Sequence, residues 1–486
     1  MTREIKIYNT LSGKKELLKP VEPGHVKMYA CGVTPYDECH IGHAMQSVFF
    51  DVIRNYLEYA GYTVTYVRNF TDVDDKIIDR SAKLGISPPD LAEKMIQSSR
   101  DDMEALRIRD ASHEPKVSET IPEIIEFIEQ IIKNEAAYVT SDGDVYYRVR
   151  QKSDYGKLSN RKPDELKSGT RDIVQGSKED ALDFALWKKD TTEGASWESP
   201  WGVGRPGWHI ECSAMARKFL GASFDIHGGG RDLVFPHHEN EIAQSESANC
   251  CDYASVWMHS GLLTLNKQKM SKSLGNFITI KDFLKGWSYE VLRLGYLQNH
   301  YASNIDFSED LFNTCRKRLL YYYETLKQLD EQAEEQTGAK PTLDIDKFRE
   351  DFHRALSDDF NTVEAIGTLN LLMKQANQIL QKKKTPEQKH TAFQIGSLIR
   401  EWGSVFVLFQ EDPQTYIETL KDRLLPERNL TREQIESDVA RRQKARDEKN
   451  WELSDQIRNE LLQQGITISD APEGTVWSIR GTQSGD

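Results

Sequence analysis

The sequence has few cysteines, no long apolar run and no excess of positive charge. Its 486 residues include six cysteines, too few for a disulfide framework in a chain of this length. No stretch approaches the roughly 20 apolar residues that a membrane helix needs. The first residues, Met1–Lys6, lack the apolar core of an export signal. We therefore expect a cytoplasmic protein with no membrane partner.

The charge balance is acidic, with 77 acidic residues against 63 basic ones and a formal net charge of −14. An acidic total argues against indiscriminate binding of polyanions, although a local basic face is enough to bind nucleic acid. The fractions of hydrophobic residues (38%) and charged residues (29%) are typical of a globular protein. At roughly 100–200 residues per domain, the length predicts about three to five domains.

The N-terminal part predicts a strand, a helix and a second strand. Residues 26–30 form a short apolar run, which Cys31 and Gly32 follow. Apolar residues then recur at three- and four-residue steps over 48–57, as in a helix. Residues 62–67 are rich in β-branched and aromatic side chains, as in a strand. Such a unit predicts a parallel sheet with a nucleotide site at the carboxyl ends of its strands, where residues 31–43 would lie.

The remaining chain predicts an α/β fold: a Rossmann-type parallel-sheet catalytic domain with an insertion, then an α-helical bundle and a small C-terminal domain. The supporting segments are a helix at 119–132, a hairpin at 138–149, a polar and loop-rich insertion at 152–202, a helix at 209–219, a strand at 224–227 ended by three glycines, an almost wholly helical region at 289–409, a charged helical segment at 431–464, and turns and short strands from Gly465.

The string His40-Ile41-Gly42-His43 lies between the first predicted strand and helix. Backbone N–H groups and the helix dipole favour an anion at such a place. Two imidazoles separated by a glycine can approach a phosphate closely and donate hydrogen bonds to it. The alternative is two unrelated histidines in a turn.

The string Lys269-Met270-Ser271-Lys272-Ser273 is followed by a further leucine, glycine and asparagine. Two lysines on a loop suit a negative charge that develops only in a transition state, such as that of departing pyrophosphate. The alternative is a solvated basic loop.

Four residues that are distant in the sequence form a candidate metal site. Residues 235–241 are predicted to open a helix on which His237 and Glu241, four residues apart, share one face. Cys31 and Cys212 could join them, and two thiolates, one imidazole and one carboxylate can hold zinc. The alternative is two core cysteines and a structural His–Glu pair. Three further histidines either line the same pocket or form structural hydrogen bonds: His209, His227 and His238.

With these motifs in this order, the chain resembles the cysteinyl-tRNA synthetases, a family of class I aminoacyl-tRNA synthetases. The matching stretches are 29–43, 66–77, 204–247, 269–276 and 444–477. The resemblance implies one Zn²⁺ ion per chain, held by Cys31, Cys212, His237 and Glu241. It also implies the following contacts: His40, Gly42, His43, Gly230, Asp232 and Lys272 with ATP, and Gly32, Thr71 and Trp208 with the amino acid. His40, His43, Lys269 and Lys272 would form the catalytic set.

The expected activity is ATP-dependent ligation of L-cysteine to cysteine tRNA through a cysteinyl-adenylate, with Mg²⁺ accompanying ATP. Zinc favours a thiolate over the hydroxyl of serine, which explains how such an enzyme could select cysteine without an editing domain. The insertion at 152–202 is too short to be an editing domain. We expect a monomer that serves protein biosynthesis.

A basic run near the C-terminus predicts the contact with tRNA. It consists of Arg441, Arg442, Lys444 and Arg446, and Trp451 follows. Guanidinium and indole groups suit phosphates and unpaired bases. The alternative is a solvated helix face with a core tryptophan. With the resemblance, the predicted regions are the catalytic domain (1–119 and 203–260), the insertion (120–202), a signature-loop and stem-contact region (261–310), the helical bundle (311–410) and the anticodon-binding domain (411–486).

Two other functions are compatible with parts of this pattern. A related ligase joins cysteine to an amino sugar by the same adenylate chemistry, but it lacks a full anticodon module, so the region 441–477 argues against it. A non-catalytic tRNA-binding relative is the second alternative, and the intact signatures and ligand set argue against it. One departure from the family pattern is Ala302, where members commonly have an arginine after a His-Tyr pair, which puts any role of that arginine in doubt.

Overall fold

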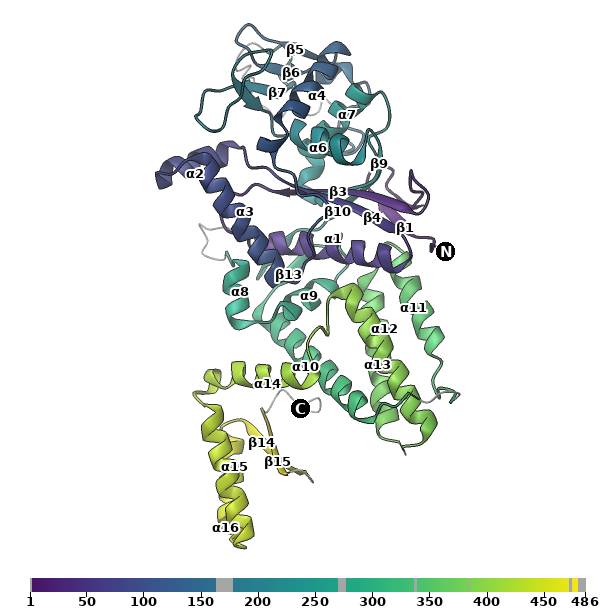
Figure 1. Ribbon diagram of the computed structural model, residues 1–486, viewed down its shortest axis with the longest axis vertical. Helices are drawn as coiled ribbons and strands as arrows, with labels where there is room; N and C mark the ends of the chain where they lie inside the picture. The colour runs from purple at the N-terminus through teal and green to yellow at the C-terminus, as the bar shows by residue number, and fades with distance from the viewer. Residues whose placement is uncertain are drawn as a thin grey trace. The chain divides into compact units, whose positions relative to one another are not determined.

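Figure 1 shows the computed structural model of the chain, which describes residues 2–162, 178–269, 277–335, 339–382, 384–471 and 474–479. The chain forms two compact units. The first comprises Met1–Leu284, Tyr296–Asp306 and Arg354–Val363, and the second comprises Lys285–Gly295, Phe307–His353 and Glu364–Asp486. None of the helices in the described ranges is long and apolar enough to cross a membrane.

The first unit is built on a four-stranded parallel sheet, which confirms the predicted fold class. Its strands are β3 (His25–Val33), β4 (Thr63–Phe70), β9 (Phe224–Gly230) and β10 (Ala254–Ser260), and they lie in the order β10-β9-β3-β4. β4 lies on one side of β3, and β9 and β10 lie on the other. The direction of winding therefore reverses between β3 and β9, and ligand sites in such sheets lie at the carboxyl ends of the strands at that point.

Helices α1 (Ile41–Tyr59) and α6 (Ile210–Leu220) cover opposite faces of this sheet (Figure 1). The predicted helix at 48–57 lies inside α1, and the predicted strand at 62–67 overlaps β4. The prediction that the glycines end the strand at 224–227 was wrong, because β9 continues to Gly230. A side chain would not fit there: a Cβ on Gly228 would lie 2.2 Å from the Phe50 ring, and one on Gly229 would lie 2.7 Å from the His238 ring. Here the glycines allow close packing rather than a turn.

A second sheet contains three strands from the predicted insertion and one, β8, that lies beyond its predicted end at residue 202; the predicted hairpin at 138–149 is confirmed. The strands β5 to β8 pair antiparallel in sequence order. The segment 152–202 was predicted to be loop-rich, yet it contains β7, whose Trp187 is fully buried. The elements from β4 to β8 are α2 (Asp75–Leu84), α3 (Pro88–Ala105), α4 (Ile121–Lys133), β5 (Ala137–Val139), β6 (Val145–Tyr147), β7 (Phe184–Lys189) and β8 (Gly204–Pro206).

Short elements complete the surroundings of the parallel sheet. They are the hairpin of β1 (Lys6–Asn9) and β2 (Lys14–Leu17), the helices α7 (Glu239–Asn249) and α8 (Ile280–Gly286), and a three-stranded sheet of β11 (Leu263–Leu265), β12 (Gln268–Lys269) and β13 (Ile305–Phe307). Strand β10 was not predicted, because its sequence ASVWMHS mixes polar and apolar residues without a clear period.

The second unit is mostly helical, which confirms the predictions for 289–409 and 431–464. Its core includes the stacked rings of Phe352 and Trp402, whose centroids are 4.4 Å apart. The C-terminal strands pair as an antiparallel hairpin. The elements from α9 on are α9 (Tyr289–Leu297), α10 (Glu309–Gln332), α11 (Ile345–Ser357), α12 (Thr362–Leu380), α13 (Pro386–Phe406), α14 (Pro413–Leu424), α15 (Arg432–Asp447), α16 (Trp451–Gln463), β14 (Ile466–Ala471) and β15 (Gly474–Ile479).

The five predicted regions remain predictions, because the two compact units divide the chain differently. Residues of the predicted region 261–310 contribute to both units.

Candidate metal and amino acid site

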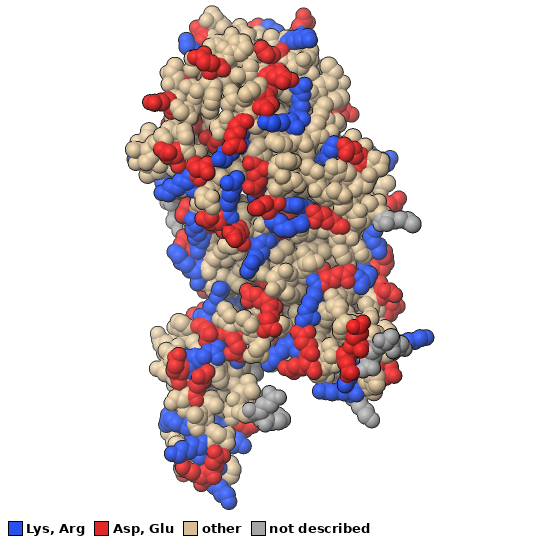
Figure 2. Space-filling view, viewed as in Figure 1, with Lys and Arg blue, Asp and Glu red and all other residues tan. Residues whose placement is uncertain are grey.

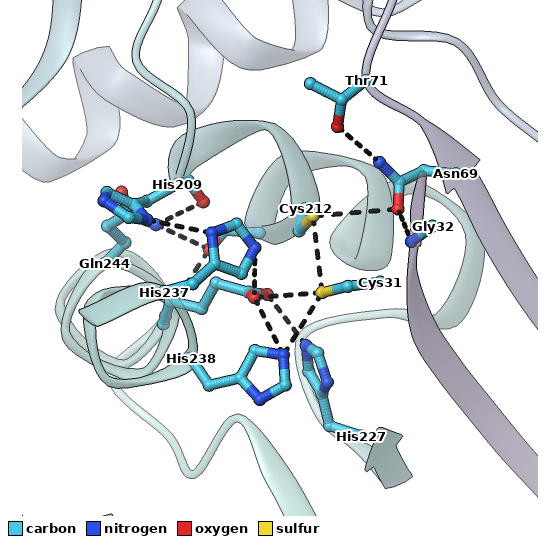
Figure 3. A network of polar contacts seen from close by, with 12 residues as sticks. Cys31, Gly32, Asn69, Thr71, His209, Cys212, His227, His237, His238 and Gln244 are labelled. Carbon is cyan, nitrogen blue, oxygen red and sulfur yellow. Dashed lines mark hydrogen bonds and ion pairs between the residues drawn. The ribbon is translucent and has the colours of Figure 1, made fainter. Parts of the chain in front are cut away.

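Four buried donor side chains converge at the edge of the parallel sheet, as predicted. Cys31 lies near the end of β3, Cys212 on α6, and Glu241 in the first turn of α7. His237 lies in a π-helical turn, Val234–His238, directly before α7, rather than on the regular helix that was predicted. The four ligand atoms lie within 4.8 Å of one another, and Figure 3 shows Cys31, Cys212 and His237 directed toward one centre.

The distances between these donors suit a tetrahedral zinc ion. With Zn–S bonds of about 2.3 Å, two sulfur ligands lie about 3.8 Å apart. The Sγ atoms of Cys31 and Cys212 are 3.8 Å apart, and both are free thiols. Glu241 Oε1 lies 3.5 Å from Cys31 Sγ and 3.1 Å from His237 Nε2. The side chains therefore already have the spacing of the corners of one coordination shell.

The electrostatics favour the ionised, metal-binding forms of Glu241 and Cys212, whereas Cys31 stays a neutral thiol and His237 stays protonated in the absence of a metal. Burial raises the pKa of Glu241, but the charges of His227 and His237 outweigh it and hold the pKa well below its usual range. Burial likewise opposes the charged form of His237, yet Glu241 raises its pKa to about 10. A hydrogen bond from Cys31 lowers the pKa of Cys212 to about 6, whereas burial raises the pKa of Cys31. A metal ion would take the place of the proton on His237.

Further polar side chains contact the four donors and orient them. His227 Nε2 lies 2.8 Å from Glu241 Oε2, and the Tyr253 hydroxyl donates to the same oxygen at 3.1 Å. His238 Nε2 lies 3.4 Å from Cys31 Sγ, and its Nδ1 lies 2.8 Å from His259 Nε2. Thus His227 and His238 line the cluster of candidate metal donors. His209 also lies beside it, with its Nδ1 3.0 Å from the Nδ1 of His237.

A second set of donors, Cys31, His227, His238 and Glu241, is also close enough to hold a metal. The set with Cys212 suits zinc better, because it contains both sulfurs and soft thiolates are preferred zinc ligands. In that arrangement His227 serves as the hydrogen-bond partner that fixes the ligating carboxylate, as outer-shell groups commonly do.

Asn69, which sequence reasoning missed, ties the metal cluster to the predicted amino acid pocket (Figure 3). Its Oδ1 accepts from Gly32 N at 3.0 Å and lies 3.8 Å from Cys212 Sγ, and its Nδ2 donates to Thr71 Oγ1 at 3.3 Å. Gly32 and Thr71 are thereby brought together. The available signal was an asparagine near the carboxyl end of an apolar parallel strand, where polar side chains tend to face ligands.

The predicted residue Trp208 also borders the cluster. Its side chain is 41% exposed, and its ring centroid is 4.4 Å from that of His237. A large aromatic ring that is exposed beside buried metal donors can form one wall of a substrate pocket.

The predicted histidine signature forms the start of α1. His40 is the N-cap, and its Nδ1 accepts hydrogen bonds from the backbone N–H groups of Gly42 and His43 at 3.0 and 3.3 Å. His43 Nδ1 accepts in return from His40 N at 3.3 Å. An accepting Nδ1 carries no proton, so each ring has its proton on Nε2, a hydrogen-bond donor. Burial lowers the pKa of His43 to about 3, so its ring is neutral at pH 7.

His40 and His43 line a pocket together with residues 33–39, Met95, Ser99 and Phe277. The residues that follow the second signature lie against the first one. Ile41 N donates to Ile278 O, and Ile280 N donates to Cys39 O, both at 3.1 Å. The second signature itself lies outside the described residues, including Lys272, and of Lys269 only the backbone in β12 is described.

The predicted ATP-binding residues Gly230 and Asp232 lie where β9 ends. A Cβ on Gly230 would lie 2.4 Å from Asp232 Oδ1, so the carboxylate packs directly over this glycine. Gln46 of α1 is near the same point, and its Nε2 donates to the Cys31 carbonyl at 2.9 Å. This glycine and its carboxylate are therefore close to the carboxyl edge that also holds Cys31.

The predicted tRNA contacts separate into two groups. Arg442 is buried and donates to both oxygens of Asp470 at 2.8 and 3.2 Å, and Arg446 also pairs with Asp470. Hydrogen bonds from Arg442 hold the pKa of Asp470 well below its usual range. Arg441, Lys444 and Trp451 are exposed instead. Figure 2 shows basic and acidic side chains interspersed along α15 and α16 on this face, so the exposed groups are the better candidates for an external contact.

Two family models match the chain. One, described as the tRNA synthetases class I (C) catalytic domain, matches residues 17–317, and one described as the DALR domain matches residues 351–410. A protein of Desulfotalea psychrophila named cysteine–tRNA ligase is 44% identical over 485 residues, which is 98% of this chain and 99% of the relative. One of Geobacter metallireducens with the same name is 46% identical over 484 residues, 98% and 100% of the two chains.

Among solved structures, methionyl-tRNA synthetase of Mycobacterium tuberculosis bound by methionyl-adenylate is similar in fold. The TM-score is 0.59 at 13% sequence identity, and the match covers 79% of this chain and 92% of that one. Identity this low shows a common fold and nothing about the residues of the site.

Gly32 lies so close to the backbone of Asn69 that no side chain fits at this position. A Cβ on Gly32 would lie 1.7 Å from the backbone oxygen of Asn69, and the paired strands β3 and β4 leave little room to move. We expect Gly32→Ala to destabilise the protein by at least about 1–3 kcal/mol and to reduce its bound metal, as measured by thermal unfolding and metal analysis. Gly367→Ala is the control, because nothing lies within 4 Å of its new Cβ. Wild-type stability and metal content in Gly32→Ala would contradict this account.

Proposed function

The chain belongs to the cysteine–tRNA ligase family of class I tRNA synthetases, and we propose that its Cys/His/Glu cluster holds one zinc ion that recognises the sulfur of substrate cysteine. The enzyme catalyses ATP-dependent ligation of cysteine to tRNA. The observation that carries the zinc proposal is the convergence of Cys31, Cys212, His237 and Glu241 at coordination distances. The match over 98% of the chain, C-terminal region included, favours tRNA over an amino sugar as the acceptor.

Discrimination between cysteine and serine is the chemical problem that this site has to solve. The two side chains differ by one atom, and a pocket that relies on hydrogen bonds separates such near-isosteres poorly. A bound zinc ion supplies a Lewis acid that favours a thiolate and binds a neutral hydroxyl weakly. The four ligands fix its position, and Trp208, Thr71 and Gly32 would surround the rest of the amino acid.

The first signature is proposed to position ATP. The Nε2–H groups of His40 and His43 would donate to its phosphates, and Gly42 permits their close approach at the start of α1. Because the His43 ring is neutral, it would contribute a hydrogen bond to the phosphates and no positive charge. Gly230 and Asp232 would contact the ribose, and Lys269 and Lys272 would add positive charge.

The reaction needs no covalent nucleophile from the protein. The carboxylate of cysteine attacks the α-phosphate of ATP, which Mg²⁺ accompanies, and pyrophosphate leaves. A ribose hydroxyl of the terminal adenosine of the tRNA then takes the cysteinyl group and releases AMP. The residues around these groups act by orientation and by stabilising charge. We further propose that the enzyme works as a monomer in the cytoplasm.

The tRNA contact is proposed for the exposed groups of the C-terminal segment. Lys444 and Arg441 would meet phosphates, and the exposed ring of Trp451, at the start of α16, would stack on an unpaired base. Arg442 and Arg446 would support this surface through Asp470 of β14.

Removal of zinc tests the recognition of sulfur. After exhaustive chelation we expect cysteine-dependent ATP–pyrophosphate exchange to fall by at least about 100-fold and to return on addition of zinc. Cys212→Ser should bind less zinc, whereas the control Cys315→Ser, which alters a buried cysteine of the second unit, should keep it. A chelated, zinc-free enzyme that still prefers cysteine over serine would refute the proposal.

Lys272→Ala tests the second signature. Because the lysine is proposed to stabilise charge only as pyrophosphate departs, we expect the rate of adenylate formation to fall about 100- to 1,000-fold with an unchanged melting temperature. Lys267→Ala, at an exposed lysine of the preceding turn, is the control. Near-normal pyrophosphate exchange in Lys272→Ala would remove this residue from the mechanism.

Trp451→Ala tests the tRNA contact. Loss of a stacked base costs about 1–3 kcal/mol, so we expect the KM for tRNA in the charging reaction to rise about 10- to 100-fold with unchanged pyrophosphate exchange. Leu371→Ala serves as the control because Leu371 is equally exposed but lies on α12. If both variants charge tRNA like the wild type, the stacking role of Trp451 is wrong.

A further inference from the structure

Glu211 is a buried carboxylate that none of the functions described so far uses. It lies in the first turn of α6, directly before the metal ligand Cys212, and only 1% of its surface is exposed. Its Oε2 has no hydrogen-bond partner among the described residues. Burying an unpaired carboxylate is costly, so an unsatisfied one in a folded protein indicates a missing partner.

The charged groups nearest to Glu211 do not compensate it. They are Cys212, Asp72 and Asp74, which are all anionic when ionised, and the hydrogen-bonding neighbour is the Thr71 hydroxyl. Within the described part of the chain, no lysine, arginine or histidine forms an ion pair with Glu211. The start of a helix favours a negative charge there. None of the described residues therefore supplies a cation that would pair with this carboxylate.

The two neighbouring aspartates already have partners. Asp72 accepts from Ser118 N at 3.0 Å and also from the Ser118 hydroxyl. Asp74 caps α2 by accepting from Lys76 N at 2.8 Å. Among these three acidic residues, Glu211 is the one with a buried oxygen that has no hydrogen-bond partner among the described residues, and the aspartates add to the negative potential around it.

We propose that Glu211, together with the Thr71 hydroxyl, binds the α-ammonium group of substrate cysteine. The inference rests on the proposed recognition of sulfur at Cys212 and its partners. In cysteine only two carbon atoms separate the ammonium nitrogen from the sulfur, so a sulfur held beside Cys212 brings the ammonium group to the residues that adjoin Cys212. Thr71 is held by Asn69, which also contacts Gly32 and Cys212. Asn69 therefore positions both the proposed sulfur subsite, at Cys212, and the proposed ammonium subsite, at Thr71.

This arrangement makes the site selective for an amino acid among small thiols. Zinc alone would accept any thiolate that fits, whereas a buried carboxylate binds more tightly to a thiol compound that also carries a positive charge. A hydrogen-bonded pair between ionised groups in a site closed to water is stronger than a neutral hydrogen bond.

The test compares L-cysteine with 3-mercaptopropionate, which lacks the ammonium group, in the wild type and in Glu211→Gln. The zinc-loaded enzyme is used. The KM for cysteine is measured by pyrophosphate exchange, and the inhibition constant of 3-mercaptopropionate is measured in the same assay. We expect Glu211→Gln to raise the KM for cysteine about 10- to 100-fold, with no change in the inhibition constant of 3-mercaptopropionate or in the KM for ATP.

Two further variants keep the test decisive. Glu246→Gln removes a carboxylate on α7 that pairs with Lys152 and Lys157, and it should leave all three constants unchanged. Thr71→Val should reproduce the selective loss, and it replaces Glu211→Gln if that variant does not fold. Equal loss of affinity for cysteine and 3-mercaptopropionate, or an unchanged KM for cysteine, overturns the role of Glu211.

The cobalt-substituted enzyme separates this inference from the zinc proposal. A thiolate-to-metal absorption band on addition of cysteine to the wild type supports recognition of sulfur by the metal. If no band forms, the zinc proposal fails whatever Glu211 does. A third outcome is that the band forms in both the wild type and Glu211→Gln while the variant shows no selective loss of affinity for cysteine relative to 3-mercaptopropionate. In that case only the role of Glu211 fails.

Discussion

The candidate site depends on a buried cluster of donor side chains, namely Cys31, Cys212, His237 and Glu241. A buried carboxylate or thiolate is unfavourable unless it is paired or bound to a cation. Here Glu241 is stabilised by His227, His237 and Tyr253, so contacts within the protein already compensate its charge. The direction of winding reverses between β3 and β9, which is the place where ligand sites form in such sheets.

A second constraint joins the parts of the site into one frame. Asn69 of β4 holds Gly32 of β3, the hydroxyl of Thr71 and the sulfur of Cys212 through a single side chain. The absence of a side chain on Gly32 allows the two strands to approach this closely. The donor cluster is therefore tied to Gly32 and Thr71, the residues proposed to surround the amino acid, which suits a reaction whose rate depends on orientation.

The insertion also supports the site. The Glu239 carboxylate, at the start of α7, accepts from Gly156 N at 2.9 Å and from both the N–H and the hydroxyl of Ser159 at 2.8 Å. Tyr155 donates to Asn240 at 2.6 Å. A segment that is polar and loop-rich in the sequence thus braces the helix that carries Glu241, and its loops satisfy a charge that would otherwise be buried alone.

The sequence by itself determined the parallel-sheet fold and the helical C-terminal half, and it singled out four donor side chains that lie close together in the fold. It could do so because apolar periodicity and motif strings are local, and because the family resemblance joined residues that are far apart. Only the tertiary structure decided that Asn69 contacts Gly32, Thr71 and Cys212, that glycines 228–230 continue β9, that Arg442 is bound to Asp470, and that one oxygen of Glu211 has no hydrogen-bond partner among the described residues. Each of these depends on which side chain meets which across the fold, and no local pattern encodes such a contact.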